Sequence, residues 1–186
     1  MKKLLSLGGE HRINVHAGDE AGFRQACGHG HGGIVELLLS LGGDRCIDVH
    51  ADNEAAFRDA CANGHAAVVG MLLSLGGGRC IDVHADNEAG FRQACGNGNG
   101  GIIHMLLALD GDRRVDVHNP FCGGVYTVAR LGHEDVLELL LSLQGDRRMV
   151  IQDGDGDAFE AACSEGHEGI VRMLLALDGD RRINVH

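Results

Sequence analysis

The sequence predicts an all-α solenoid in which five full helical hairpins of 34 residues stack in a single array over residues 1–186. Three observations support this fold class. Apolar residues recur at a constant step of 34 positions, each step contains two short helical patterns, and glycine-rich turns separate these patterns. Self-similarity at a period of about 20–50 residues is the sequence signature of a repeat architecture.

The 34-residue step is visible in several columns of equivalent residues. An apolar residue opens each repeat, at Ile13, Ile47, Ile81, Val115, Met149 and Ile183. A second column consists of Phe23, Phe57, Phe91, Val125 and Phe159. A glycine recurs at Gly30, Gly64, Gly98, Gly132 and Gly166. The step divides the chain into a partial repeat, five full repeats and a second partial repeat, with the ranges 1–12, 13–46, 47–80, 81–114, 115–148, 149–182 and 183–186.

The first helix of each repeat is expected after a short polar segment. In the second full repeat this segment is Asp-Asn-Glu at 52–54, which combines N-cap residues with the negative charge that a first helical turn favours. Phe57, Ala60 and Cys61 follow at i, i+3 and i+4 and form one apolar helical face. The helix is expected to end at Asn63-Gly64.

The second helix is expected to begin at His65. Its wider apolar stripe consists of Val68, Val69, Leu72, Leu73 and Leu75. Gly76–Gly78 should end the helix, because glycine is the usual residue in a left-handed C-cap. Residues 79–84 then lead in an extended segment into the next repeat. A single hairpin cannot bury such a stripe, so neighbouring hairpins are expected to stack on it.

These residues resemble the ankyrin repeat. Phe57 stands at the family's Leu position, Ala60-Cys61 at its Ala-Ala and Gly64-His65 at its Gly-His pair. Asn53 and Asn87 stand where the family has a turn glycine, and Asn tolerates positive φ better than most residues. The resemblance covers nearly the whole chain, although the period is 34 residues where about 33 is usual, and Thr-Pro-Leu-His is absent. It implies a non-catalytic ankyrin-repeat scaffold for protein-protein interaction.

Charge and composition restrict the function further. The formal net charge of -11 disfavours nucleic acid, which proteins bind through clustered Lys and Arg, and it disfavours anionic membrane surfaces. No apolar run reaches the roughly 18 residues of a membrane-spanning helix, and the run after Met1 is too short for a signal peptide. We therefore expect a cytoplasmic protein in a reducing environment, and a basic protein partner.

Seven cysteines and twelve histidines form ladders in which neighbours lie one repeat apart. Packed helices lie about 8–10 Å apart, whereas bridged Cys need Cα atoms within about 7 Å and zinc ligands lie about 2 Å from one ion. We therefore expect packed cysteines and no metal site. The resemblance implies that the histidines after the turn glycine bond neighbouring turns. A second histidine column ends the extended segment, and there a pH response is the alternative to a purely structural role: His16, His50, His84, His118 and His186.

Three segments imitate functional motifs without the required context. Residues 28–33 and 96–101 satisfy G-x-G-x-x-G, but a helix and not a strand is predicted before them. Residues 153–157 resemble the start of an EF-hand loop, but Ala158 and Ser164 replace its Gly and Glu. No unique set of catalytic groups lies outside the repeat pattern, so we expect neither an enzyme nor a cofactor.

A column of arginines accompanies the extended segments, with aspartates close by in the sequence. We expect these arginines to form surface ion pairs with the aspartates, and a ligand-binding stripe is the alternative. The column consists of Arg45, Arg79, Arg113, Arg147 and Arg181.

The resemblance implies that a partner contacts the turn tips and the exposed side of the first helices. The fourth repeat departs most from the pattern and contains the only Pro and the only Tyr, so a specific contact is expected there, with drift of a degenerate repeat as the alternative. The residues expected to bind a partner are Asp52, Glu54, Asn63, Asp86, Glu88, Asn97, Pro120, Tyr126, Arg130 and Leu131.

The ends of the array suggest a second class of function. Neither end shows the polar cap that solenoids need for solubility. One expectation is a self-assembling structural protein that stacks head-to-tail into filaments, and another is a fragment of a longer ankyrin array. The residues expected to make end contacts are Leu4, Leu5, Leu7, Ile183 and Val185.

Overall fold

The computed structural model describes residues 13–119, 124–149 and 156–177, and every regular element within these ranges is a helix. The predicted all-α class is therefore confirmed. The α-helices form consecutive pairs: α2 (Ala17–Gly28) with α3 (Gly32–Leu39), α4 (Ala51–Ala62) with α5 (Ala66–Leu73), α6 (Ala85–Gly96) with α7 (Gly100–Leu107), α8 (Gly124–Leu131) with α9 (Glu134–Ser142), and α10 (Gly156–Glu165) with α11 (Glu168–Leu175).

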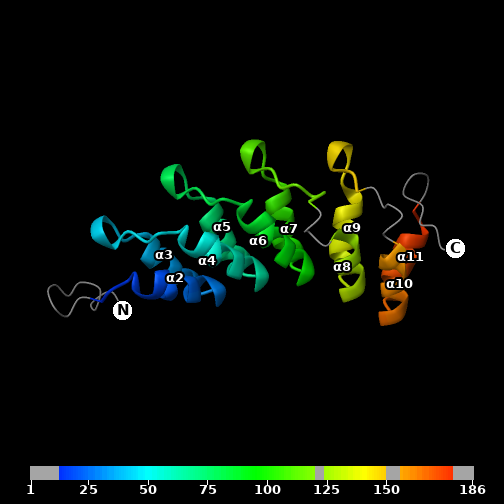
Figure 1. Cartoon of the computed structure of the whole chain (residues 1–186), viewed down its shortest axis with the longest axis horizontal. Helices are drawn as coiled ribbons and strands as arrows, with labels where there is room; N and C mark the ends of the chain where they lie inside the picture. Colours follow the sequence, from blue (N-terminus) through cyan, green and yellow to red (C-terminus); the bar gives the residue numbers. More distant parts are fainter. Residues whose placement is uncertain (1–12, 120–123, 150–155, 178–186) are drawn as a thin grey trace.

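The helix pairs follow one another in a single row from the N-terminal to the C-terminal side (Figure 1). The first helix of each pair packs on the first helix of the next, as α2 does on α4 and α8 does on α10, and the second helices pack in the same way. One-turn 3-10 helices project together on one side of the row (Figure 1). They are η2 (Gly43–Arg45), η3 (Gly77–Arg79), η4 (Gly111–Arg113) and η6 (Gly145–Arg147).

The core lies between the two helical layers and is continuous along the row. Phe57, Ala60 and Cys61 are almost fully buried, which confirms the predicted apolar face of the first helix. Val68, Val69 and Leu72 of the second helix are equally buried, whereas Leu73 and Leu75 are half-buried. Gly90 permits close packing in this core, because a Cβ there would lie 2.6 Å from the ring of Phe57.

Side chains in the turns bond consecutive helix pairs. His65 Nε2 donates to the Gly28 carbonyl at 3.0 Å, and His133 Nε2 donates to the Gly96 carbonyl at 2.9 Å. Asn99 takes the place of a histidine and donates to the Ala62 carbonyl at 2.9 Å. The expected role of these turn residues is therefore confirmed at the described turns.

The start of the first helices differs from the prediction. Asp52, Asn53 and Glu54 have φ values of 54, 56 and 64° and form a left-handed turn, with no side-chain cap on the helix. Positive φ was expected only at the Asn53 column, because Asn is the residue type that tolerates it. Equivalent left-handed turns occupy residues 18–20 and 86–88.

Three arginines of the column contact helix ends in place of the expected aspartates. Arg79, Arg113 and Arg147 donate through Nη1 to the carbonyls of Leu39, Leu73 and Leu107 at 3.2, 3.1 and 2.6 Å. These carbonyls end second helices 40 residues earlier. The guanidinium charge therefore meets the negative end of a helix dipole, and this interaction replaces pairing with aspartate for these three arginines.

Candidate functional site: the exposed face of the first helices

On the exposed face of the first helices, one column of equivalent residues changes along the row from basic to aromatic and then to acidic. It consists of Arg24, Arg58, Arg92, Tyr126 and Glu160. Arg24 Nη1 lies 2.7 Å from Asp52 Oδ2, and Arg58 Nη1 lies 2.8 Å from Asp86 Oδ2. The two aspartates are therefore exposed, as expected, but each is already neutralised by an arginine of the preceding helix pair. Exposed pairs of this kind contribute about 0–1 kcal/mol.

Two predicted partner-binding residues, Glu54 and Glu88, lie inside the molecule, and their assignment to the surface is wrong. Each is 3 % exposed. Glu54 Oε1 lies 2.6 Å from His50 Nδ1 and accepts from the Asp82 backbone N–H at 3.0 Å. The left-handed turn rotates these carboxylates inward, toward the next helix pair. A partner could not reach them without opening that turn.

The predicted residues Asn63 and Asn97 are exposed, but their amides serve the turns. Asn63 Nδ2 donates to the Gly28 carbonyl at 2.9 Å, and Asn97 Nδ2 donates to the Ala62 carbonyl at 2.9 Å. Both side chains connect consecutive first helices. Only their amide oxygens, with no hydrogen bond in the part of the chain that the structure describes, are left for a partner.

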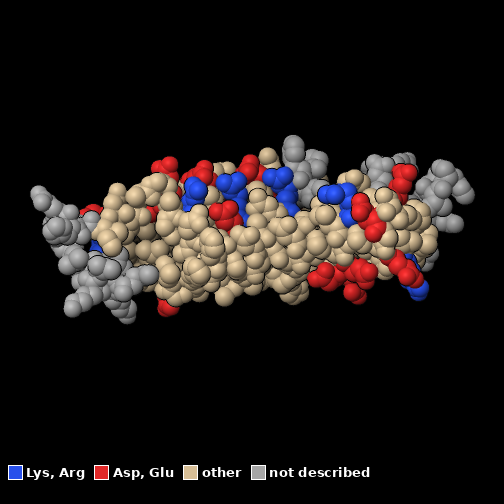
Figure 2. Space-filling model, turned by 90° about the horizontal axis from the view of Figure 1, so that it is seen from below, with Lys and Arg blue, Asp and Glu red and all other residues tan. Residues whose placement is uncertain are grey.

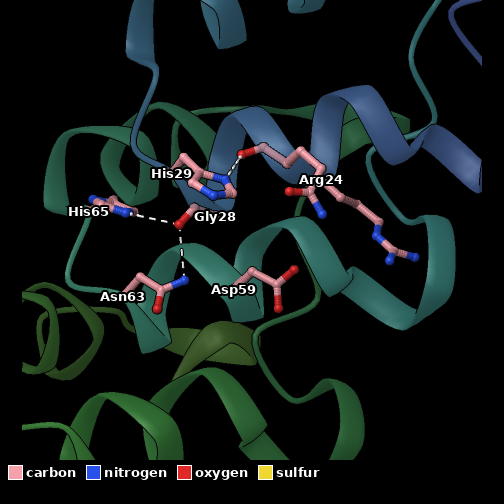
Figure 3. A pocket seen from close by; sticks show the side chains of 7 residues that line it. Arg24, Gly28, His29, Asp59, Asn63 and His65 are labelled. Atoms are coloured by element: carbon pink, nitrogen blue, oxygen red, sulfur yellow. Dashed lines mark hydrogen bonds between the residues drawn. The ribbon is translucent and has the colours of Figure 1, made fainter.

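A first hollow of about 490 Å³ opens between the C-terminal ends of α2 and α4 (Figure 3). Gly28 lies at its wall, where the carbonyl accepts from both Asn63 and His65. His29 Nδ1 donates to the Gln25 carbonyl at 2.8 Å. The Asp59 carboxylate lies beside this hollow, is exposed, and has no hydrogen bond or ion pair to any described residue. It is therefore a free negative charge at a polar depression.

A second hollow of about 390 Å³ lies between α8 and α10 and is lined by Tyr126, Glu160, Ala161 and Ser164. Tyr126 is 42 % exposed. Glu160 is exposed and makes no hydrogen bond or ion pair within the described ranges. The hollow thus combines an aromatic ring, a free carboxylate and a hydroxyl, which is a set of groups suited to a cationic side chain.

The other residues predicted to bind a partner or to make end contacts fall into two groups, those that are accessible and those that lie outside the described residues. Leu131 is 39 % exposed, and Arg130 is exposed while its carbonyl accepts from His167 Nε2 at 3.1 Å. Both remain accessible at the end of α8. The remaining predicted residues lie outside the described residues: Pro120, Leu4, Leu5, Leu7, Ile183 and Val185.

Asp59 and Glu160 were not among the residues predicted from the sequence to bind a partner. Glu160 could have been found, because it shares the column of Arg24 and Tyr126 and reverses the charge of that column. The burial of Glu54 also has a sequence signal. A histidine stands four residues before it, and the same spacing recurs in His16 with Glu20.

The buried cysteines supply little reactive chemistry. Burial raises the pKa of Cys27 to about 12, with a smaller contribution from Asp59, and burial also raises the pKa of Cys61. Such thiols stay protonated and unreactive.

Among the described residues there is no group of three or more His, Cys, Asp or Glu that could hold a metal ion. Within the same residues, no helix is long and apolar enough to cross a membrane.

Charge is distributed unevenly over the surface. Figure 2 shows basic and acidic side chains together along one edge of the molecule, with a broad area lacking charged side chains beside it. A group of acidic side chains lies at the opposite edge, toward the C-terminal part of the row (Figure 2). Glu134 and Asp135 begin α9 and are exposed. The start of α9 therefore carries exposed negative charge.

Comparison with known proteins adds no assignment to this geometry. No protein-family model matches the chain, and no curated protein matches its sequence.

Proposed function

We propose that the chain is a non-catalytic interaction scaffold of the ankyrin-repeat type, which binds a basic segment of a protein partner. One observation carries the proposal: the exposed Tyr126 and the carboxylate of Glu160 line the same hollow between α8 and α10. A Lys or Arg side chain would place its charge between the ring face and the carboxylate. Cation–π contacts contribute about 0.5–1 kcal/mol at exposed sites.

The rest of the chain supports the same class of partner. The net charge is -11, and Asp59 supplies a second free carboxylate at the hollow between α2 and α4. Arg24 and Arg58 are neutralised by Asp52 and Asp86. An extended basic segment lying along the first helices would therefore meet a free carboxylate at each hollow. Arg24 and Arg58 would repel it little, because their charges are already paired with aspartates.

The ankyrin-type assignment rests on the sequence columns and agrees with the helix pairs. The first helices begin at Ala17, Ala51 and Ala85, which are 34 residues apart. Turn histidines bond consecutive pairs. A row of helix pairs offers an extended surface, which is how stacked helical repeats bind partners.

A fluorescein-labelled peptide of alternating Arg and Gly tests the proposal, with an Asp-Gly peptide as the matched control. Fluorescence anisotropy should show that the Arg-Gly peptide binds the chain and that the Asp-Gly peptide does not. Binding of the Arg-Gly peptide should weaken as the salt concentration increases. Tyr126→Ala should weaken binding roughly 2–5-fold, and Glu160→Gln should also weaken it. Glu36→Gln, on the exposed side of α3, should bind as the unmodified chain does. Equal binding by all variants would contradict the proposed site.

Self-assembly is the second candidate function, and one exposed leucine favours it. Leu175 at the end of α11 is 60 % exposed, whereas the equivalent Leu107 at the end of α7 is 9 % exposed. The helix pair after α7 packs against it through α9. A second copy stacked on α11 would cover Leu175 in the same way. Sedimentation velocity over a range of concentrations should then show species larger than the monomer, which Leu175→Glu should remove. A strictly monomeric chain would exclude this function.

A further inference from the structure

Three histidines, which precede the left-handed turns of α2, α4 and α6, have the same surroundings. The Nδ1 atoms of His16, His50 and His84 lie 2.6, 2.6 and 3.0 Å from Oε1 of the glutamate four residues later. Their Nε2 atoms lie 2.9, 3.0 and 2.9 Å from backbone carbonyl oxygens 28 residues later, those of Asp44, Gly78 and Asp112. Both nitrogens of each ring therefore face an acceptor.

A backbone carbonyl on one side of the ring and an ionised carboxylate on the other together require two ring protons. A neutral imidazole has one N–H donor and one lone pair, whereas the imidazolium ion has two donors. A carbonyl oxygen cannot donate, and an ionised carboxylate only accepts. We infer that His16, His50 and His84 are imidazolium ions in the folded protein, and that each is a pH-sensitive clamp joining its helix pair to the next.

The glutamate of each clamp is itself hydrogen-bonded to the segment that leads into the next helix pair. Glu20, Glu54 and Glu88 are each 3 % exposed. Their Oε1 atoms accept from backbone N–H groups 28 residues later, at 3.1, 3.0 and 2.8 Å, those of Asp48, Asp82 and Asp116. Oε2 of Glu20 and of Glu54 is buried and has no hydrogen-bond partner among the residues that the structure describes. A buried carboxylate is strongly unfavourable unless an opposite charge accompanies it, and the imidazolium supplies that charge.

The backbone at the clamp is strained, so it depends on these bonds. Glu20, Glu54 and Glu88 have φ values of 61, 64 and 60°. Left-handed conformation is unfavourable for residues other than glycine, and each turn has two or three such residues in succession. Removing the ring proton would leave the glutamate charge uncompensated in a turn that is already unfavourable. Deprotonation should therefore loosen the contact between consecutive helix pairs.

The charged groups that face the rings have the same sign. Those that act on the rings are Glu20 and Asp44 on His16, Glu54 and Asp48 on His50, and Glu88 and Asp82 on His84. For His16 and His50 the hydrogen bond to glutamate is the main cause of a raised pKa. For His84, burial lowers the pKa, but the bonds to the Asp112 carbonyl and to Glu88 outweigh it and the pKa is raised.

His118 is a matched internal control. Its Nε2 also lies 3.0 Å from a carbonyl oxygen 28 residues later, that of Asp146. The residue four positions after it is Cys122, and not Glu. His118 therefore keeps the bond to the next helix pair but lacks the glutamate of a clamp. The three clamps belong to the first three helix pairs.

Nitrogen-15 NMR of the histidine rings in the full chain tests the inference, because the nitrogen shifts distinguish imidazolium from either neutral tautomer. We expect His16, His50 and His84 to be doubly protonated at pH about 7, above the ordinary histidine pKa. In Glu54→Gln, the titration midpoint of His50 should move down toward its ordinary value near 6.5, while that of His16 is unchanged. The ring signals of His118 at a fixed pH should not respond to this substitution. A neutral His50 tautomer at pH about 7 in the unmodified chain would overturn the inference, even if the variant failed to fold.

Discussion

The turn glycines show how a single atom affects contact between helix pairs. Gly30 has a φ of 70°, and a Cβ there would lie 2.5 Å from Nδ1 of His65. Gly43 has a similar φ of 63°, but a Cβ there would meet nothing within 4 Å. The two positions therefore share the same backbone requirement and differ only in the contact with a neighbouring ring.

Gly30→Ala should consequently destabilise the chain more than Gly43→Ala does. The left-handed backbone accounts for about 1–2 kcal/mol in each variant, and displacement of the His65 ring adds about 1–3 kcal/mol in the first. Urea unfolding followed by circular dichroism would measure both. Equal losses of unfolding free energy would mean that the ring moves aside without losing its bond to Gly28.

At the scale of elements, the ends of the second helices depend on residues far away in the sequence. The carbonyl of Leu107 accepts from Arg147 Nη1 at 2.6 Å, and the carbonyl of Leu109 accepts from Nη2 at 3.4 Å. Arg147 lies in η6, so the one-turn helix after the fourth pair stabilises the C-terminus of α7. The projecting segments therefore stabilise neighbouring helices as well as connecting the pairs.

Arg147→Met should lower the free energy of unfolding by about 1–2 kcal/mol, because it leaves two carbonyls and a helix dipole without their cation. Arg172→Met is the matched control. Arg172 is exposed and pairs with Glu168 one turn earlier on α11, which contributes about 0.3–0.5 kcal/mol. The urea midpoints of the two variants would separate the effects. A stable Arg147→Met variant would mean that water satisfies the carbonyls.

At the scale of the whole molecule, the three clamps predict a stability that depends on pH. The pKa values of His16, His50 and His84 are raised in the folded state. Their stabilisation is therefore fully present below the unfolded value near 6.5 and is lost as pH rises through the folded values. The melting temperature should fall when the pH is raised from about 6 to about 8.

A variant with Glu20→Gln, Glu54→Gln and Glu88→Gln should show a smaller fall over the same range. Buried thiols such as Cys27, whose pKa is raised to about 12, also lose stabilising effect at high pH, but they contribute equally to both proteins. Scanning calorimetry of the two proteins at matched ionic strength measures the difference. Parallel pH profiles would show that the clamps do not control the stability of the row.

The sequence predicted correctly those parts of the fold that depend on residues close together in the chain. The periodicity of Phe57, Ala60 and Cys61 predicted a buried helical face, because a helix repeats every 3.6 residues whatever lies beside it. The turn histidines also behave as expected. At the candidate site, Tyr126 and Leu131 were selected from the sequence and are exposed, at 42 and 39 %.

The sequence by itself therefore determined the helix pairs, their spacing and their apolar faces. Only the tertiary structure decided that Glu54 is buried, that Arg147 caps a helix 40 residues away and that Glu160 shares a hollow with Tyr126. The physical reason is that each outcome depends on a partner in another helix pair, or on a left-handed turn that redirects a side chain. Neither can be read from the periodicity of one segment, because a period describes a helix face and not what lies opposite that face.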